Sequence, residues 1–495
     1  MKRNVVLTIA AVASIALAIP FQLGAQNNKG NQQHHHYTLI DMGTFGGPQS
    51  YINDGSGGLF AVSIANNRGQ LTGWADTSLS DPFPNSCFDP DCFTAHAFRW
   101  QDGDRTDLGA LPNGASSAST SISSNGLIAG ISENGSVDPL VPGFPVGHAV
   151  LWQNGGLTDL GTLEGGYESL AYAVNSGGQV AGVFTNTTAD PNSMFGTGYQ
   201  ARAFLWQNGA MQDLGTLGGP DAQALLINER GQVVGWSYTS SSPGGCGFPG
   251  QALTTGSYIW EEGKGMKDLG NLGGTCTIAS DLNPRGQVAG FSTLAGDLAQ
   301  HGFLWSAGTL YDLGGSFGGS STAAFALNEA GEAVGFGNLP GDTVFHAALW
   351  KRVGKITDLG TVVSGETNFA ESINAKTQVV GAEYDSSGAP SAFLWENGSI
   401  ADLNTLVLPA SPLHLQFSFN INDHGEIAAT SVDASGNEHA VLLTPCDENH
   451  PGVEGCDYSL VESSATAVPQ TDPAVHDVSN RTMSPLLRHP MRRYH

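Results

Sequence analysis

The residues best suited to chemistry in this chain are aspartates and histidines that recur at regular intervals. A carboxylate beside an imidazole is an arrangement that general acid–base catalysis uses. The recurring aspartates are Asp41, Asp107, Asp159, Asp213, Asp268, Asp312, Asp358 and Asp402. The recurring histidines are His96, His148, His301, His346 and His439. A catalytic carboxylate is normally unique, whereas repeated copies are typical of side chains that cap turns or bond the backbone. We therefore predict that these residues are structural and that none of them is catalytic.

These residues belong to a repeated unit, seen most clearly at residues 201–235. Its four short apolar runs are 203–206, 211–215, 222–228 and 232–235. Turn residues separate the runs: Asn208-Gly209 is a strong hairpin signal, and Gly231 is placed where a longer hairpin loop needs a positive φ. No part of the unit spaces apolar residues by three and four, as an amphipathic helix does. The unit therefore predicts four β-strands.

Three independent markers give the same number of units. The first run ends in an aromatic residue, the second contains the recurring aspartate, and the fourth ends in glycine. The aromatic residues are Trp100, Trp152, Trp206, Trp260, Trp305, Trp350 and Trp395, with Leu443 in the eighth place. The glycines are Gly73, Gly130, Gly182, Gly235, Gly290, Gly335 and Gly381, with Ala429 in the eighth place. Eight units over residues 37–456 give a period of roughly 52 residues, and four strands at such a period are typical of a β-propeller blade.

The two ends of the repeat region complement each other. The first unit begins at its second run, residues 37–43, and the last unit ends at its first run, residues 440–444. Pairing these segments in one sheet would close the ring and remove two sheet edges. We predict an all-β fold: an eight-bladed β-propeller of four-stranded antiparallel blades, closed by the N- and C-terminal strands.

The motifs of the unit resemble those of the HAF-repeat family of extracellular bacterial proteins. They are Ala-Phe-Leu-Trp at 203–206, Asp-Leu-Gly-Thr-Leu-Gly-Gly at 213–219 and Ile-Asn-x-x-Gly-Gln-Val-Val-Gly at 227–235. The departures from the motifs are Ser123 for the turn Asn, Gly302 for the first Ala and Thr377 for the turn Gly. The resemblance covers nearly the whole chain after its leader. It implies a secreted protein and no particular activity.

The N-terminal segment has the features of a signal peptide. Lys2 and Arg3 precede an apolar run over residues 5–19, and small residues up to Ala25 offer a cleavage site. We expect a leader over 1–25, removed near Ala25, and a secreted, extracellular or periplasmic protein. No later run is long enough for a membrane-spanning helix.

Two polar segments flank the repeat region. Residues 26–36 are predicted to be a polar linker; a loose metal site at His34–His36 is the weaker alternative. Residues 457–495 are rich in Ser, Thr, Pro and Ala and are predicted to be a disordered tail.

The charge of the chain excludes one class of partner. A formal net charge of −26 at pH 7 argues against nucleic acid, whose phosphates need basic partners. Acid-rich secreted proteins can hold Ca²⁺, but the sequence has no Asp-x-Asp-x-Asp-Gly loop, so we predict neither a metal site nor a cofactor. We expect a monomer.

Six cysteines in an exported chain indicate three disulfides. Cys87 and Cys92 share one loop, and Cys446 and Cys456 share another. Cys246 and Cys276 remain, and strand alternation places their loops on one face. We predict the pairs Cys87–Cys92, Cys246–Cys276 and Cys446–Cys456.

One face of the predicted propeller carries all the long insertions, because antiparallel strands alternate in direction. In the first four units the connection from the fourth run to the next first run is long: 74–95, 131–147, 183–202 and 236–257. Loops on a rigid scaffold commonly bind ligands. The aromatic residues Trp74, Tyr199, Trp236 and Tyr238 are our candidates for binding a glycan or a protein; packing of these rings against the scaffold is the structural alternative.

A binding module is the function that this pattern favours. The sequence contains no Gly-x-Ser-x-Gly elbow, no His-Glu-x-x-His motif and no phosphate-binding loop. Propeller hydrolases and lyases often assemble their sites from scattered residues, so a carbohydrate-active enzyme is the alternative. Unique carboxylates that converge in the centre would favour that alternative, and Glu164 and Glu168 are the nearest candidates.

Overall fold

The structure is a computed structural model of the chain. It describes residues 33–52, 63–84, 86–89, 91–140, 143–163, 165–243, 253–408 and 410–462. The predicted leader, residues 26–32 of the predicted linker and residues 463–495 of the predicted tail lie outside these ranges.

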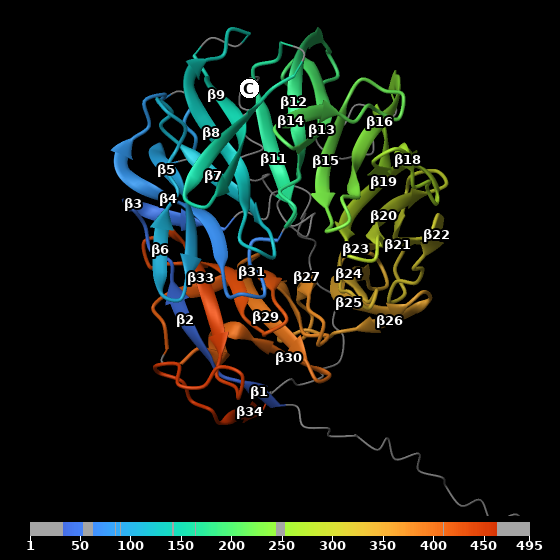
Figure 1. Ribbon diagram of the computed structural model, residues 1–495. Coiled ribbons are helices and arrows are strands. Elements are labelled where there is room, and N and C mark those ends of the chain that lie inside the picture. The colour runs from blue at the N-terminus through green and yellow to red at the C-terminus, as the bar shows by residue number, and fades with distance from the viewer. Residues whose placement is uncertain are drawn as a thin grey trace, which may run out of the picture. The chain divides into compact units, whose positions relative to one another are not determined.

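The described residues confirm the all-β class. They form six four-stranded antiparallel sheets, one eight-stranded sheet and one two-stranded sheet, with a single short helix, α1 (Leu403–Leu406). The eight-stranded sheet consists of two four-stranded halves, joined by one parallel bridge between Thr255 and Cys276. Figure 1 shows the sheets following one another in the order of the chain.

Each four-stranded sheet or half has the same order, which we name inner, second, third and outer strand. The inner strands are β3 (Gly46–Tyr51), β7 (Ser117–Ile122), β11 (Ser169–Val174), β15 (Ala222–Ile227), β19 (Gly273–Leu282), β23 (Thr322–Leu327), β27 (Thr367–Ile373) and β31 (His414–Ile421). The second strands are β4 (Leu71–Ser80), β8 (Ile128–Val137), β12 (Val180–Ala189), β16 (Val233–Pro243), β20 (Val288–Leu294), β24 (Ala333–Asn338), β28 (Val379–Tyr384) and β32 (Ile427–Val432). The third strands are β5 (Phe93–Gln101), β9 (Pro145–Gln153), β13 (Tyr199–Gln207), β17 (Leu253–Glu261), β21 (Gln300–Ser306), β25 (Phe345–Arg352), β29 (Pro390–Glu396) and β33 (Glu438–Pro445). The outer strands are β2 (Tyr37–Asp41), β6 (Asp104–Asp107), β10 (Gly156–Gly161), β14 (Ala210–Asp213), β18 (Gly265–Asp268), β22 (Thr309–Asp312), β26 (Lys355–Asp358) and β30 (Ser399–Asp402).

The recurring glycine of the second strand has a steric reason. A Cβ at Gly235 would lie 1.9 Å from the carbonyl oxygen of Gln223 on the inner strand. At Gly381 the same atom would lie 2.1 Å from the carbonyl oxygen of Phe369 and 2.9 Å from the ring of Phe393. Only glycine allows this approach of backbone and aromatic ring. The phenylalanine of the third strand, such as Phe393, and the glycine of the second strand are therefore parts of one packing unit.

The two ends of the repeat region share one sheet, as predicted. Strand β2 pairs with β33 in antiparallel register, with Tyr37 opposite Pro445 and Asp41 opposite Val441. In Figure 1 the blue strand β2 lies beside the red strand β33. The outer strand of this sheet thus comes from the opposite end of the chain.

A series of asparagine side chains links neighbouring sheets at the turns between inner and second strands. Each Asn Nδ2 donates to the backbone carbonyl of the corresponding residue in the next unit, over 2.9–3.2 Å. The links are Asn66 to Ser123, Asn175 to Asn228, Asn228 to Asn283, Asn283 to Asn328, Asn328 to Asn374, Asn374 to Asn422 and Asn422 to Asn66. At the departure from the motif, Ser123, the link to the next unit comes from Asn125, whose Nδ2 donates to the carbonyl of Ser176. The asparagine of the Ile-Asn motif therefore connects sheets as well as shaping its own turn.

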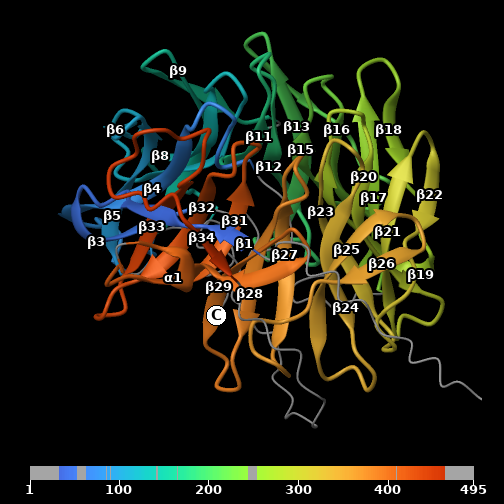
Figure 2. The same ribbon diagram turned by 90° about the horizontal axis from the view of Figure 1, so that it is seen from below.

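A two-stranded sheet extends the fold beyond residues 37–456. Strand β1 (Gln33–His35) pairs with β34 (Leu460–Glu462), and Figure 2 shows the two side by side. His34 is buried, with Nδ1 3.2 Å from Glu396 Oε1 and Nε2 3.3 Å from Ser399 Oγ. Residues 33–35 of the predicted linker and residues 460–462 of the predicted tail are thus strands that pair with each other, and burial of His34 anchors the first of them.

Two of the three predicted disulfides are present. They are Cys87–Cys92 and Cys446–Cys456. Cys276 takes part in a disulfide, and its predicted partner Cys246 lies outside the described residues.

Candidate functional site on the loop-bearing face

The recurring aspartates of the outer strands bond the backbone, as predicted. In every copy the Asp Oδ1 accepts the N–H of the residue two positions later, over 2.6–2.8 Å. The donors are Gly43, Gly109, Gly161, Gly215, Gly270, Gly314, Gly360 and Asn404. This bond stabilises the turn after the outer strand. The aspartates are structural groups.

The recurring histidines complete the same arrangement. Each Nδ1 lies 2.9–3.1 Å from the carboxylate of the adjacent outer strand. The pairs are His96–Asp107, His148–Asp159, His301–Asp312, His346–Asp358 and His439–Asp41. Partial burial raises the pKa of Asp107 and Asp159, but the histidine and the turn N–H outweigh it, and the net pKa is lowered. The carboxylates of Asp107 and Asp159 therefore stay ionised at neutral pH and remain bonded to a histidine and a turn N–H.

A different part of the molecule, the face that carries the insertions, is named here the loop-bearing face. It comprises the segments 81–92, 138–144 and 190–198 and the connections from outer to inner strands. Asp81, Asp138 and Asp190 each precede a proline and accept the N–H two residues later. Ser86 Oγ donates to the carbonyl of Gly143 over 3.0 Å. This bond joins the first two insertions to each other.

The aromatic residues predicted to bind ligand divide into two groups. Trp74 and Tyr238 are buried in the hydrophobic core, so neither offers an exposed aromatic surface. Trp74 stacks on Tyr51 at 5.3 Å, and its Nε1 donates to Asp89 Oδ1 over 3.1 Å. Tyr199 and Trp236 are half-buried. For Trp74 and Tyr238, packing within the scaffold overrides exposure, because both rings belong to hydrophobic core clusters.

A group of carboxyls with unusual surroundings lies next to Trp74. Asp76 and Asp89 are fully buried; Asp76 Oδ2 accepts the Gln49 N–H over 2.9 Å, and Gln49 Nε2 donates to Asp91 Oδ2 over 2.9 Å. Asp89 Oδ2 has no hydrogen-bond partner among the described residues. Burial, then a hydrogen bond with the Asp91 carboxyl, raises the pKa of Asp76 to about 9. Burial likewise raises the pKa of Asp89 to about 8. Both carboxyls are protonated at neutral pH.

Two more carboxyl pairs lie on the same face. Asp221 accepts the N–H groups of Met194 and Ala201, and burial together with the neighbouring Asp190 raises its pKa to about 7. Glu366 shares a hydrogen bond with Glu383; burial and this neighbour raise the pKa of Glu366 to about 7. Paired carboxyls share a proton because two adjacent negative charges repel each other.

Sequence reasoning missed these carboxyls. Of the two acidic residues expected near the centre, Glu164 lies outside the described residues and Glu168 is half-buried. The repeated Asp-Pro at the ends of three second strands was an available signal for Asp81, Asp138 and Asp190. The contacts of Asp76 with Asp91, and of Asp221 with Asp190, join residues 15 and 31 positions apart, as counted along the sequence. Only the fold brings them together.

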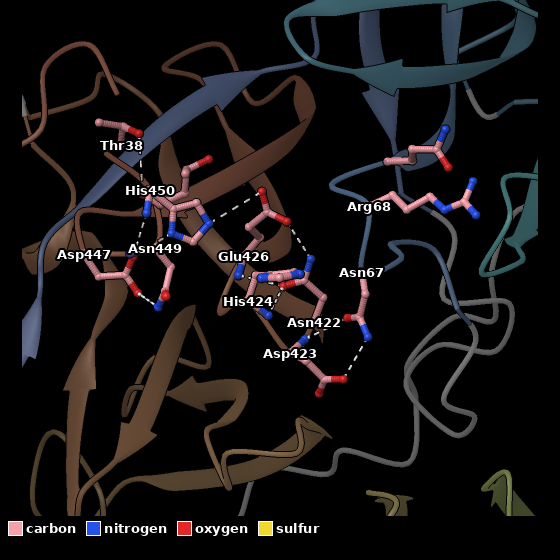
Figure 3. Close-up of polar contacts among 12 residues, drawn as sticks. Thr38, Asn67, Arg68, Asn422, Asp423, His424, Glu426, Asp447, Asn449 and His450 are labelled. Atoms are coloured by element: carbon pink, nitrogen blue, oxygen red, sulfur yellow. Dashed lines mark hydrogen bonds and ion pairs between the residues drawn. The ribbon is translucent and has the colours of Figure 1, made fainter. Parts of the chain in front are cut away.

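A second polar cluster, drawn in Figure 3, lies where the last repeat meets the first. His450 Nδ1 lies 2.7 Å from Asp447 Oδ1, and its Nε2 lies 3.9 Å from Glu426 Oε1. Glu426 Oε2 accepts from Asn422 Nδ2, which belongs to the asparagine series. The cluster attaches the loop of the Cys446–Cys456 disulfide to the last sheet, near the contact between the last repeat and the first.

No group of three or more His, Cys, Asp or Glu side chains in the described part of the chain is arranged to hold a metal ion. No helix within the described ranges is long and apolar enough to cross a membrane.

Comparison with known proteins gives weak likenesses. No protein-family model and no curated protein matches the chain. A puromycin-hydrolysing peptidase of Mycobacterium tuberculosis aligns over 79% of this chain and 61% of its own, at 12% identity and a TM-score of 0.38. Dipeptidyl peptidase 4 of Porphyromonas gingivalis aligns over 68% and 53%, at 9% identity and a TM-score of 0.42. TolB of Acinetobacter baumannii aligns over 81% and 67%, at 11% identity and a TM-score of 0.32. The chain thus spans just over half to two thirds of these proteins, and no functional argument rests on them.

Proposed function

We propose that the repeats form a closed eight-bladed β-propeller, related to the HAF-repeat proteins, that is secreted and acts as a binding module. Two observations support closure: β2 of the first unit pairs with β33 of the last, and the asparagine series returns from Asn422 to Asn66. A ring closed in this way leaves no unpaired sheet edge where the first and the last unit meet.

Secretion is supported by the cysteines. Disulfides such as Cys87–Cys92 and Cys446–Cys456 persist in oxidising compartments outside the cytosol. Removal of a leader near Ala25 remains our proposal; N-terminal sequencing of the exported protein tests it.

Exposed apolar side chains on the loop-bearing face carry the proposal of a binding module. Leu79 at the end of β4 is 66% exposed and Val137 at the end of β8 is 49% exposed. Tyr167, between β10 and β11 of the next unit, is 36% exposed. They come from consecutive units, on the side where the insertions are braced by the disulfide and by the Ser86 contact. Exposed apolar groups on an ordered surface are typical of an interaction site.

The carboxylates favour binding over catalysis. The repeated aspartates are held by turn N–H groups and histidines. The unique carboxyls Asp76 and Asp89 are buried and bonded to their neighbours, away from solvent. A general acid or base must reach its substrate within hydrogen-bond distance. The carbohydrate-active enzyme is therefore the less supported function.

A double substitution on the loop-bearing face tests the proposal. Leu79→Asp with Val137→Asp should abolish binding to whichever ligand the wild type retains in a panel of neutral polysaccharides and extracellular proteins, measured by biolayer interferometry. Leu298→Asp is the matched control: Leu298 is 96% exposed but lies in a short connection of another unit, between β20 and β21. Equal binding by the double variant, equal loss in the control, or no binding of any panel member by the wild type contradicts the proposal.

A further inference from the structure

Five aromatic rings from three neighbouring sheets lie in a row, which we name the aromatic row. The ring centroids of Phe336 and Phe345 are 5.1 Å apart, and that of Phe345 lies 6.5 Å from Phe369 of the next sheet. Phe369 stacks on Tyr384 at 6.0 Å, and Tyr384 lies 6.4 Å from Phe417 of the sheet after it. Each ring is therefore next to another, and an elongated ligand that contacts one ring meets its neighbours.

The direction of the strands places the aromatic row at the loop-bearing face. Strand β25 begins at Phe345 and β28 ends at Tyr384, each at a connection between a second and a third strand. Phe369 lies near the start of β27, which follows a connection from an outer strand. Phe369 is 7% exposed, and the other four rings are half-buried. Most of the row thus keeps part of its aromatic surface in contact with solvent.

Carboxyl groups flank the row at Tyr384. Glu383 and Asp385 are its neighbours in the chain, and Asp385 is exposed. Glu366 precedes Thr367, which lies opposite Tyr384 in the sheet. Glu366 shares a hydrogen bond with Glu383 and interacts electrostatically with Asp385. Three carboxyl groups therefore lie close to one another beside the middle of the row.

Lys and Arg side chains lie at the other end of these sheets. From residue 253 onward, those of the described residues occur in or beside the hairpins of third and outer strands, or in turns between inner and second strands. They are Lys264, Lys267, Arg285, Lys351, Arg352, Lys355 and Lys376. Both kinds of turn lie opposite the loop-bearing face, because antiparallel strands alternate in direction. The carboxyl groups beside Tyr384 form no ion pair with a Lys or Arg of the described chain.

This combination determines the chemistry of a suitable ligand. The face of an aromatic ring attracts a cation, and a carboxylate binds a guanidinium through charge-assisted hydrogen bonds. The planar guanidinium of arginine makes both contacts at once, which the ammonium of lysine does less well. Carboxyl groups beside the row disfavour an anionic ligand. The extent of the row, across three sheets, exceeds a single side chain and suits a chain that carries several.

We propose that the aromatic row and the carboxyl groups beside it bind an extended, arginine-rich peptide segment. Its guanidinium groups stack on the half-buried rings and pair with Glu366, Glu383 and Asp385. The site lies on other strands than Leu79 and Val137 and goes beyond the binding module proposed above, so it does not depend on those residues.

Titration calorimetry of the full chain with a capped hexa-arginine peptide, at physiological ionic strength, tests the site. We expect the wild type to bind, and Phe345→Leu with Tyr384→Leu to bind about tenfold more weakly, because leucine is apolar but has no π face. Asp385→Asn should weaken binding about threefold by removing one exposed charge. Glu262→Gln is the matched control: Glu262 is exposed in the hairpin between β17 and β18, and its loss should leave the affinity unchanged.

Three results would overturn the proposal by showing that the attraction is not specific. They are equal binding of a glycine–serine hexapeptide by the wild type, unchanged binding by the leucine variant, and equal weakening by Glu262→Gln and Asp385→Asn. Thermal melting checks that the leucine variant is folded; if it is not, the comparison of Asp385→Asn with Glu262→Gln decides alone.

Two further measurements separate this site from other ligands and from the other candidate surface. Choline that binds with the same dependence on the rings, while hexa-arginine does not bind, would replace the peptide by a small cation. Leu79→Ala with Val137→Ala should bind hexa-arginine as the wild type does, whatever its effect on other ligands. Loss of peptide binding in that variant would place the peptide at the first surface and overturn the assignment to the aromatic row.

Discussion

The carboxyl groups of the outer strands and those of the loop-bearing face have pKa values shifted in opposite directions. On the outer strands, a histidine and a turn N–H lower the pKa of Asp107 and Asp159. On the loop-bearing face, burial and a second carboxyl raise the pKa of Asp76 to about 9 and of Asp221 to about 7. The first kind recurs in every unit and the second does not. The difference teaches that recurrence identifies groups that build the scaffold, while groups found once mark where units have diverged.

The largest expected effect is a loss of stability at alkaline pH. Asp76 and Asp89 have folded-state pKa values of about 9 and about 8, above the ordinary 3.8. Their contribution is therefore full below pH 3.8 and is lost as pH rises through the folded-state values. Between pH 6 and pH 9 the free energy of unfolding should fall, on the order of several kcal/mol. Denaturant titrations at several pH values measure it.

Asp76→Asn with Asp89→Asn should flatten this dependence, because amides do not titrate. Asp159→Asn on an outer strand is the control and should retain the wild-type slope from pH 6 to pH 9. An identical slope in the double variant would remove the distinction between the two kinds of carboxylate.

The next effect concerns the disulfide of Cys276, at the start of β19. If its partner is Cys246, the bond closes a loop of roughly 30 residues, and Cys276→Ser should cost about 3 kcal/mol. Peptide mapping without reduction identifies the partner. A peptide that joins Cys276 to any other cysteine would refute the assignment of both loops to one face.

Removal of an outer-strand carboxylate should cost less. Asp213 accepts the Gly215 N–H over 2.7 Å and pairs with Arg202 over 2.9 Å. Asp213→Asn should cost about 1 kcal/mol of stability, with ligand binding on the loop-bearing face unchanged. Chemical denaturation and interferometry measure the two quantities. Lost binding with unchanged stability would show that recurrent aspartates also have a functional part.

The smallest effect is expected on the free energy of unfolding at acidic pH. The pKa of Asp159 is lowered, so its contribution is present above its ordinary pKa and lost as pH falls through the folded-state value. The side chain is 41% exposed, so solvent screening reduces the effect to a few tenths of a kcal/mol. His148→Gln should move the midpoint of acid unfolding slightly upward. A downward shift would mean that the histidine does not stabilise the carboxylate.

The sequence by itself determined the strands, the number of repeats, the pairing of residues 37–41 with the last repeat, two disulfides and the role of the recurring aspartates. These follow from local rules: alternation, turn residues and the spacing of markers along the chain. The tertiary structure alone decided that Trp74 and Tyr238 are buried, that His34 belongs to the fold, and that Asp76 meets Asp91. It also decided which aromatic rings of separate sheets meet, as Phe345 meets Phe369 and Tyr384 meets Phe417. Burial and contacts between separate strands depend on how units pack, and a repeat pattern describes what the units share rather than how they meet.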